Sequence, residues 1–226
     1  KNNINYFRSK ENLLFFFSKL KYIFLVNQQE IFYSKLGTKI KKDQKYIYFP
    51  LHITPEYSTS IQATIFQDQV FLIYLLSLSL PSEYILVIKE HPASLSTRVR
   101  KKSFFKKILK LPNVHFVPTS TPNKELILNS SMVIVITGTS GWEAILAEKP
   151  VINFAEHIFD EIGLSKKVNE FDKLSLDIYN ELIRVSKISP REREKKIKCL
   201  LQSILSNSFK VTFPLQCLFE NGNNYE

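Results

Sequence analysis

A polar loop at residues 137–141 is the first place where side chains could do chemistry. It follows the unbroken apolar run Met132–Ile136, and it consists of Thr137, Gly138, Thr139, Ser140 and Gly141. A helical pattern comes next, so the backbone N–H groups of the loop would point at one spot together with the positive end of the helix dipole. That spot suits an anion, most simply the phosphate of a nucleotide. A tight turn whose small residues serve only packing is the competing interpretation.

The segment Lys89-Glu90-His91-Pro92 directly follows another apolar run, Tyr84–Ile88. Because a proline disfavours helical backbone at the residue before it, His91 is expected to be extended. An imidazole held in this way can donate a hydrogen bond to a phosphate or a base. Lys89 and Glu90 would either face the same ligand or pair with each other.

Two carboxylates and one histidine complete the main candidates. Glu143 is expected in the first turn of the helix after the polar loop, where it would complement the helix dipole or accept from ribose hydroxyls. His52 and Glu56 share a loop, and either could serve as a general base or contact the donor if that loop faces a cleft. The alternative is a turn shaped by Pro50 and Pro55.

The remaining histidines and the missing motifs narrow the chemistry. His115 is expected to be a core histidine inside a strand, and His157 is a further candidate for the strand ends. The sequence has no Walker-type lysine loop and no Gly-x-Gly-x-x-Gly after its first strand, which disfavours NAD and FAD. No metal site is expected, because no cluster has the spacing of metal ligands. We therefore predict no cofactor.

Alternating apolar runs and helical patterns indicate a doubly wound α/β domain with a parallel sheet. Strands are predicted at Tyr46–Phe49, Tyr84–Ile88, Val114–Val117, Met132–Ile136 and Val151–Phe154. Helices are predicted at Asp68–Leu80, Thr97–Lys110, Asn123–Leu128, Leu174–Lys187 and Pro190–Leu205. Since parallel strands share a direction, the polar exits of three strands should meet at one edge of the sheet.

The first 45 residues differ from this pattern. They are basic and aromatic, with helical pieces predicted at Asn12–Phe24 and at Gln28–Leu36, the second ended by Gly37. We predict that residues 1–45 are the remnant of an N-terminal domain or a linker from it, with a peripheral membrane anchor as the alternative. Residues 46–226 would form one Rossmann-like domain, with C-terminal helices from about residue 172.

Composition excludes several classes of protein. At 226 residues with 44% hydrophobic content, the chain can bury a sizeable core. Two cysteines argue against a disulfide-built secreted domain and suit the cytoplasm. The net charge of +10 comes from dispersed lysines, which is more typical of a solvated surface than of a nucleic-acid groove. No apolar run reaches the roughly 18 residues of a membrane span.

Three stretches, in this order, resemble the C-terminal half of capsule polysaccharide biosynthesis proteins, which are similar to Kdo- and sialyltransferase-like enzymes of the GT-B fold. They are Tyr46-Ile-Tyr-Phe-Pro-Leu-His-Ile-Thr-Pro-Glu56, Lys89-Glu-His-Pro92 and Thr137-Gly-Thr-Ser-Gly-Trp-Glu-Ala144. The resemblance covers residues 46–160. It implies a nucleotide-binding half whose N-terminal GT-B partner domain is missing, so the fragment is expected to be incomplete as an enzyme.

The resemblance also implies roles for individual residues. His91 and Pro92 match a His-Pro pair, and Thr139 and Ser140 match a Ser/Thr element, that together grip the nucleotide of a CMP-activated sugar. Glu143 matches an acidic residue that contacts ribose. The implied function is transfer of a sugar to a glycan or glycolipid acceptor, in the cytoplasm or peripherally at the inner face of the cytoplasmic membrane.

Two rival functions stay open. A UDP-sugar-using transferase, an epimerase or a polyol-phosphate transferase would use a similar fold. A non-catalytic basic module would instead dock RNA or an anionic membrane, but the sequence lacks the aromatic-basic strand motifs of RNA-binding domains.

Overall fold

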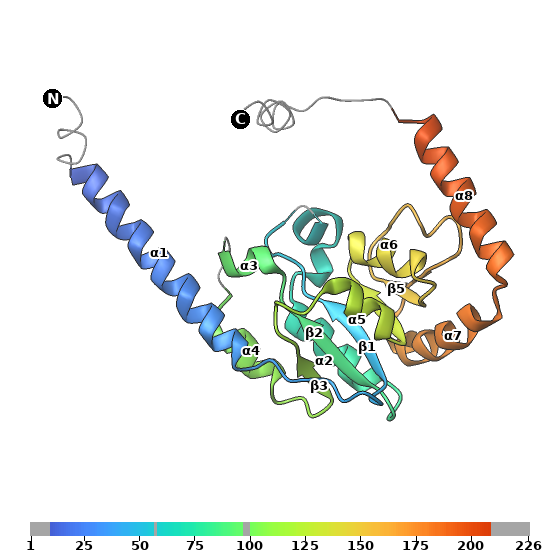
Figure 1. Ribbon diagram of the computed structural model, residues 1–226, viewed down its shortest axis with the longest axis horizontal. Helices are drawn as coiled ribbons and strands as arrows, with labels where there is room; N and C mark the ends of the chain where they lie inside the picture. The colour runs from blue at the N-terminus through green and yellow to red at the C-terminus, as the bar shows by residue number, and fades with distance from the viewer. Residues whose placement is uncertain (1–9, 57, 97–99, 209–226) are drawn as a thin grey trace, which may run out of the picture. The chain divides into compact units, whose positions relative to one another are not determined.

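The computed structural model describes residues 10–56, 58–96 and 100–208 (Figure 1). Its centre is one sheet of six parallel strands in the order β3-β2-β1-β4-β5-β6. The strands are β1 (Tyr46–Pro50), β2 (Ile85–Lys89), β3 (Val114–Phe116), β4 (Met132–Val135), β5 (Val151–Asn153) and β6 (Lys166–Lys167). The predicted parallel α/β fold is therefore confirmed, and β6 is a strand that the sequence analysis did not predict.

The strand order determines where a ligand can bind. β1 is the central strand, with β2 on one side and β4 on the other, and Ile47 pairs with both Leu86 and Met132. The connections run outward in opposite directions from this strand, so the loops after β1 and β4 diverge and leave a crevice at their carboxyl ends. The candidate residues follow these same strands.

One face of the sheet carries the main hydrophobic core. Helices α2 (Gln69–Ser79), α4 (Lys102–Ile108) and α7 (Leu174–Lys187) supply the helical side of this core. Alternate residues of the central strands, including Phe49, Ile88 and Ile134, supply the other side and are completely buried. Strands buried in this way read as continuous apolar runs because the opposite face is covered as well.

The opposite face is covered by α5 (Asn123–Asn129) and α6 (Thr139–Leu146), as Figure 1 shows for α5 over the strands. Two tyrosines of β1 fix α5 to the sheet: Tyr46 donates to the carbonyl of Leu126 at 2.8 Å, and Tyr48 donates to the Asn123 side chain at 2.7 Å. Hydroxyls buried under a helix need such partners, because an unmet buried hydroxyl is costly.

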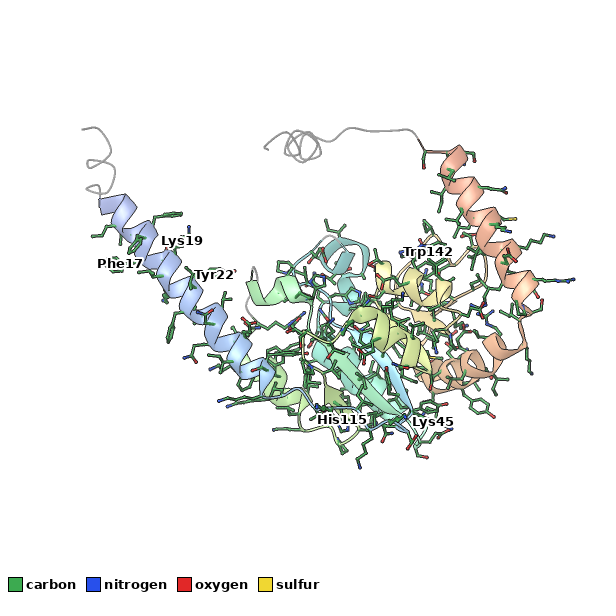
Figure 2. The ribbon with its side chains drawn as sticks, in the orientation of Figure 1. Phe17, Lys19, Tyr22, Lys45, His115 and Trp142 are labelled. Carbon is green, nitrogen blue, oxygen red and sulfur yellow. The ribbon has the colours of Figure 1, made fainter. Side chains whose placement is uncertain are left out.

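The N-terminal segment is one helix, α1 (Lys10–Ser34), and not the two predicted pieces. No glycine or proline interrupts these residues, so nothing in the sequence breaks the helix. Its end packs on the sheet domain through Tyr33, whose hydroxyl donates to the Val117 carbonyl at 2.9 Å. Its earlier turns expose large apolar side chains, and Phe17 and Tyr22 project from them (Figure 2). In the described part of the chain no helix is both long and apolar enough to cross a membrane.

The predicted basic helix at 97–110 is shorter than expected. A one-turn helix, α3 (Pro92–Ser96), begins at the His-Pro pair, and α4 starts only at Lys102. The start of the predicted helix, Thr97–Val99, lies outside the described residues. Helix α8 (Pro190–Ser206) belongs to a second compact unit, residues 188–226, whereas all other elements belong to the unit that ends at Lys187.

Candidate functional site

A cavity of about 240 Å³ lies at the carboxyl ends of the central strands. Its walls come from the ends of β1 and β2 and from the first residues of α5 and α6. The lining residues are Tyr48, Pro50, Leu51, Lys89, Glu90, His91, Pro92, Asn123, Thr139, Ser140 and Glu143. The structure thus brings together residues of all three predicted strand exits.

The polar loop places the N-terminus of α6 at this cavity. Gly138, the residue before the helix, has a φ of +101°, which an L side chain rarely adopts, and no side chain caps the helix. Thr139 and Ser140 line the cavity, so their hydroxyls stand beside the first N–H groups of α6. The cavity therefore faces the positive end of an eight-residue helix.

The other members of the loop have different surroundings. Thr137 is buried and does not line the cavity. Gly141 faces the ring of Phe159, to which an added Cβ would come within 2.9 Å. Close packing of the helix against Phe159 accounts for this glycine. The competing interpretation, a tight turn whose small residues serve packing, is therefore correct for Gly141, whereas Thr139 and Ser140 line the cavity.

Asn123 joins the two sides of the cavity, and the sequence analysis missed it. Its Oδ1 accepts from the hydroxyl of Tyr48 at 2.7 Å, and its Nδ2 donates to the Glu143 carboxylate at 2.7 Å and to Ser140 Oγ at 3.4 Å. Glu143 lies beyond the first turn of α6, contrary to the prediction, because the helix begins at Thr139. It is held beside the cavity by a side-chain amide and not by the helix terminus.

Lys89 and Glu90 do not pair with each other, which excludes one of the two predicted arrangements. Lys89 donates to the carbonyl of Thr121 at 2.6 Å, and burial lowers the pKa of its ammonium group while Glu143 opposes that shift. Glu90 is completely buried and pairs with Arg100 at 2.7 Å. Burial raises the pKa of Glu90, and the guanidinium of Arg100 works against this effect.

His91 is exposed at the cavity and has a defined tautomer. Its Nδ1 accepts from the backbone N–H of Ala93 at 3.2 Å, so the imidazole caps the first turn of α3. Partial burial lowers its pKa, whereas the carboxylate of Glu56 raises it. A neutral ring that accepts at Nδ1 carries its proton on Nε2, and this N–H is a donor for a ligand oxygen.

His52 and Glu56 do not line the cavity. His52 Nε2 lies 2.6 Å from the carbonyl oxygen of Thr137, and because a carbonyl only accepts, Nε2 carries the proton. Burial lowers the pKa of His52. Glu56 is exposed on the same loop and its charge raises the pKa of both His52 and His91.

The two remaining histidines are not cavity residues. His115 is partly exposed in the middle of β3, not fully enclosed as predicted. His157 stacks on Phe159 with ring centroids 3.7 Å apart, away from the cavity. In the residues that the structure describes, no group of three or more acidic, histidine or cysteine side chains is placed to hold a metal ion.

A family model described as capsule polysaccharide biosynthesis protein matches residues 19–174, more than half of the sequence. The chain belongs to this family. The resemblance seen in the three sequence stretches is thus confirmed, and the matched region contains the cavity and its three strand exits.

Solved structures similar to this capsule-family chain include two of KpsC from Thermosulfurimonas dismutans. The KpsC beta Kdo 2,7 transferase has 18% identity and a TM-score of 0.47, over 71% of this chain and 52% of that one. The KpsC beta Kdo 2,4 transferase has 13% identity and a TM-score of 0.45, over 68% and 55%. The UDP-GlcNAc 2-epimerase from Neisseria meningitidis bound to UDP-GlcNAc has 16% identity and a TM-score of 0.47, over 87% and 52%.

The chain therefore spans about half the length of these proteins. A search of curated protein sequences finds no match to it.

Proposed function

We propose that this chain is the nucleotide-binding half of a GT-B glycosyltransferase that makes surface polysaccharide, with a CMP-activated sugar as donor. Membership of the capsule family supports the reaction class. The observation that carries the proposal is the cavity beside the central strand, which His91, Ser140 and Glu143 all line.

In the proposed complex, the phosphate of the donor lies at the N-terminus of α6. The backbone N–H groups and the hydroxyls of Thr139 and Ser140, together with the Nε2–H of His91, donate to its oxygens. Glu143 accepts from the ribose hydroxyls, and the ammonium of Lys89 adds positive charge at the same cavity. These groups stabilise the negative charge that develops on the leaving phosphate.

The transfer breaks the bond between the anomeric carbon of the sugar and the phosphate oxygen, and CMP leaves with both electrons. A bond forms between that carbon and an acceptor hydroxyl oxygen, whose proton passes to a base. We propose Glu56 for this role, because its exposed carboxylate lies on the loop beside the cavity and within electrostatic range of His91. His52 was the other predicted base, but its Nε2 lies 2.6 Å from the carbonyl oxygen of Thr137 and already donates its proton there.

A thermal-shift panel with CMP, CDP, UDP and GDP tests the proposed donor class. We expect CMP to stabilise the protein and His91→Ala and Ser140→Ala to abolish that shift. His115→Ala is the matched control, since it removes a histidine outside the cavity. Stabilisation by UDP but not CMP would favour a UDP-sugar transferase or an epimerase. No stabilisation by any nucleotide, with salt-sensitive RNA binding, would favour the basic module.

A glycan or glycolipid acceptor at the inner face of the cytoplasmic membrane is part of the proposal, and α1 supports it. Its exposed side chains include Leu14 at 70%, Phe15 at 69% and Phe24 at 62%, and Lys19 and Lys21 stand among them. Apolar and cationic side chains on one helix favour an anionic lipid surface. Flotation with vesicles containing phosphatidylglycerol should carry the protein upward, and Phe15→Ser with Phe24→Ser should prevent it.

A further inference from the structure

The three loops that meet at the cavity are also joined to one another by a series of side chains, of which Glu90 lines the cavity and Arg100 and His52 do not. The loops are the exits of β1, β2 and β4. A chain of contacts runs from Glu90 through Arg100 and His52 to Thr137. The last contact joins residues 85 positions apart in the sequence.

Glu90, in the loop after β2, is held in place by several hydrogen bonds. Its carboxylate is completely buried, and it accepts from the backbone N–H of His91 at 2.8 Å through Oε1 and from Arg100 Nε at 2.7 Å through Oε2. Its own backbone N–H donates to the hydroxyl of Tyr33 at 2.8 Å, at the end of α1. The orientation of His91 is therefore tied to a buried charge pair.

Arg100 carries the connection from the β2 exit to the β1 exit. While its Nε pairs with Glu90, its Nη2 donates to the carbonyl oxygen of His52. The guanidinium also lies 4.7 Å from the centre of the Phe104 ring. A planar group with donors in a fixed fork can serve two acceptors at once, which an ammonium cannot do in the same geometry.

His52 carries the connection to the β4 exit. Its Nε2–H donates to the carbonyl of Thr137, next to Gly138 and the start of α6. Its backbone is also held by Gln69, which accepts from its N–H and donates to its carbonyl, both at 2.9 Å. His52 thus links a fixed backbone to the loop that presents Thr139 and Ser140.

We propose that Glu90, Arg100 and His52 are positioning residues that couple the three exits, so that His91 and the N-terminus of α6 keep one relative placement without a ligand. Such preorganisation lowers the free energy that ligand binding must spend on ordering the loops. The coupling can be measured in the protein without a ligand. The proposed function is needed only to say which ligand binds to the loops that are coupled in this way.

Hydrogen exchange of the peptide at residues 136–146, measured without ligand, tests the coupling. Arg100→Lys keeps a cation beside Glu90 but cannot also reach the His52 carbonyl. We expect it to speed exchange of that peptide about 3- to 30-fold, although Arg100 touches none of its residues. Unchanged exchange there would overturn the proposal, because it would mean that Gln69 alone holds His52.

Two further variants separate coupling from a general loss of stability. Arg184→Lys is the matched control, because Arg184 also pairs with a buried carboxylate, Glu181, at 2.7 Å, but lies on α7. It should leave exchange at 136–146 unchanged relative to a distant peptide. His52→Phe should speed exchange there, and the double variant with Arg100→Lys should add nothing further, since both break one series of contacts.

His52→Phe also keeps the test decisive if Arg100→Lys does not fold. Coupling is reciprocal, so His52→Phe should then speed exchange at residues 89–94, and no change there would overturn the proposal. Binding of CMP separates the coupling of the loops from the proposed donor. Altered exchange in a protein that does not bind CMP would leave the coupling intact and reject the proposed donor.

Discussion

Asn123 is the residue on which the geometry of the cavity depends most directly. Its amide uses one acceptor for Tyr48 and its donors for Glu143 and Ser140. Asn123→Ala would leave the buried Tyr48 hydroxyl without this partner, so we expect a loss of about 1–3 kcal/mol in the free energy of unfolding. Urea denaturation measures the loss. Asn129→Ala, at the exposed end of the same helix, is the control and should stay within about 0.5 kcal/mol of wild type.

His52 makes the stability depend on pH. Burial lowers its pKa in the folded protein, so below the usual histidine value of about 6.5 the unfolded chain takes up a proton that the folded protein does not. The contribution of His52 to the free energy of unfolding is therefore fully present above about pH 6.5. It falls as the pH drops, by at most about 1.4 kcal/mol per pH unit.

Denaturation midpoints at pH 7.5, 6.5 and 5.5 test this dependence. Glu56 raises the pKa of His52, whereas Arg100 and His91 lower it. All three residues therefore affect how steeply stability changes with pH. His52→Phe should be less stable than wild type at pH 7.5 but should lose less on acidification. An equal slope in both proteins would assign the acid sensitivity to the other histidines.

Among these residues, the groups that directly follow a strand are predictable from the sequence, whereas those that reach the cavity from the side are not. His91 and Ser140 stand out because each comes after an apolar run. Tyr48 lies inside a strand, where an aromatic residue is unremarkable, and Asn123 sits at the start of a short helix. Their roles arise from the hydrogen bond between Tyr48 and Asn123, which are 75 positions apart, so no local sequence pattern predicts it.

Among the elements, the turn from β4 into α6 shows how backbone conformation sets the site. Gly138 has a φ of +101°, and an added Cβ would meet only His52 Nε2 at 3.8 Å. Gly138→Ala should therefore destabilise the protein through backbone strain and not through a clash, by about 1–3 kcal/mol. Thermal unfolding provides the measurement, and Thr139→Ala in the same loop should have a much smaller effect. A Gly138→Ala protein as stable as wild type would show that the turn can relax.

Helix α1 is attached to the sheet domain by its last turn. The Tyr33 hydroxyl is buried, donating to Val117 and accepting from Glu90, and its ring packs edge-on against Phe105 and Phe116. Tyr33→Phe keeps the ring contacts and removes the two hydrogen bonds. We expect a loss of about 1–3 kcal/mol in unfolding free energy, measured with urea, because the Glu90 N–H loses its partner. Phe17→Ala, in the exposed part of α1, is the control.

The strands and longer helices were predictable because their periodicity is strong and glycine or proline marks their ends. β6 was not, since Lys166–Lys167 is a two-residue edge strand without an apolar run. The single helix α1 was predicted as two, because the apolar pattern shifts near Asn27 although nothing there breaks the backbone. Pairing with β5 decides β6, whereas α1 continues because no glycine or proline interrupts it.

For the whole molecule, the net charge of +10 predicts how an anionic ligand binds. Long-range attraction by dispersed lysines should weaken as salt is added, since exposed charges are screened beyond about 10 Å at 0.1 M ionic strength. We expect the Kd for CMP to rise several-fold between about 0.05 and 0.5 M NaCl. Isothermal titration with uncharged cytidine is the control. A Kd for CMP that does not change with salt concentration would show that only short-range contacts inside the cavity contribute to the affinity.

The pairing of β1 with β4 has a consequence for synthesis of the protein. Ile47 and Met132 are neighbours in the sheet, and the crevice beside them exists only when both strands are in place. A growing chain that has released β1 through β3 from the ribosome has most of the core helices but no site. The cavity at the strand ends therefore forms late, after a long loop has closed, and a half-made polypeptide lacks it.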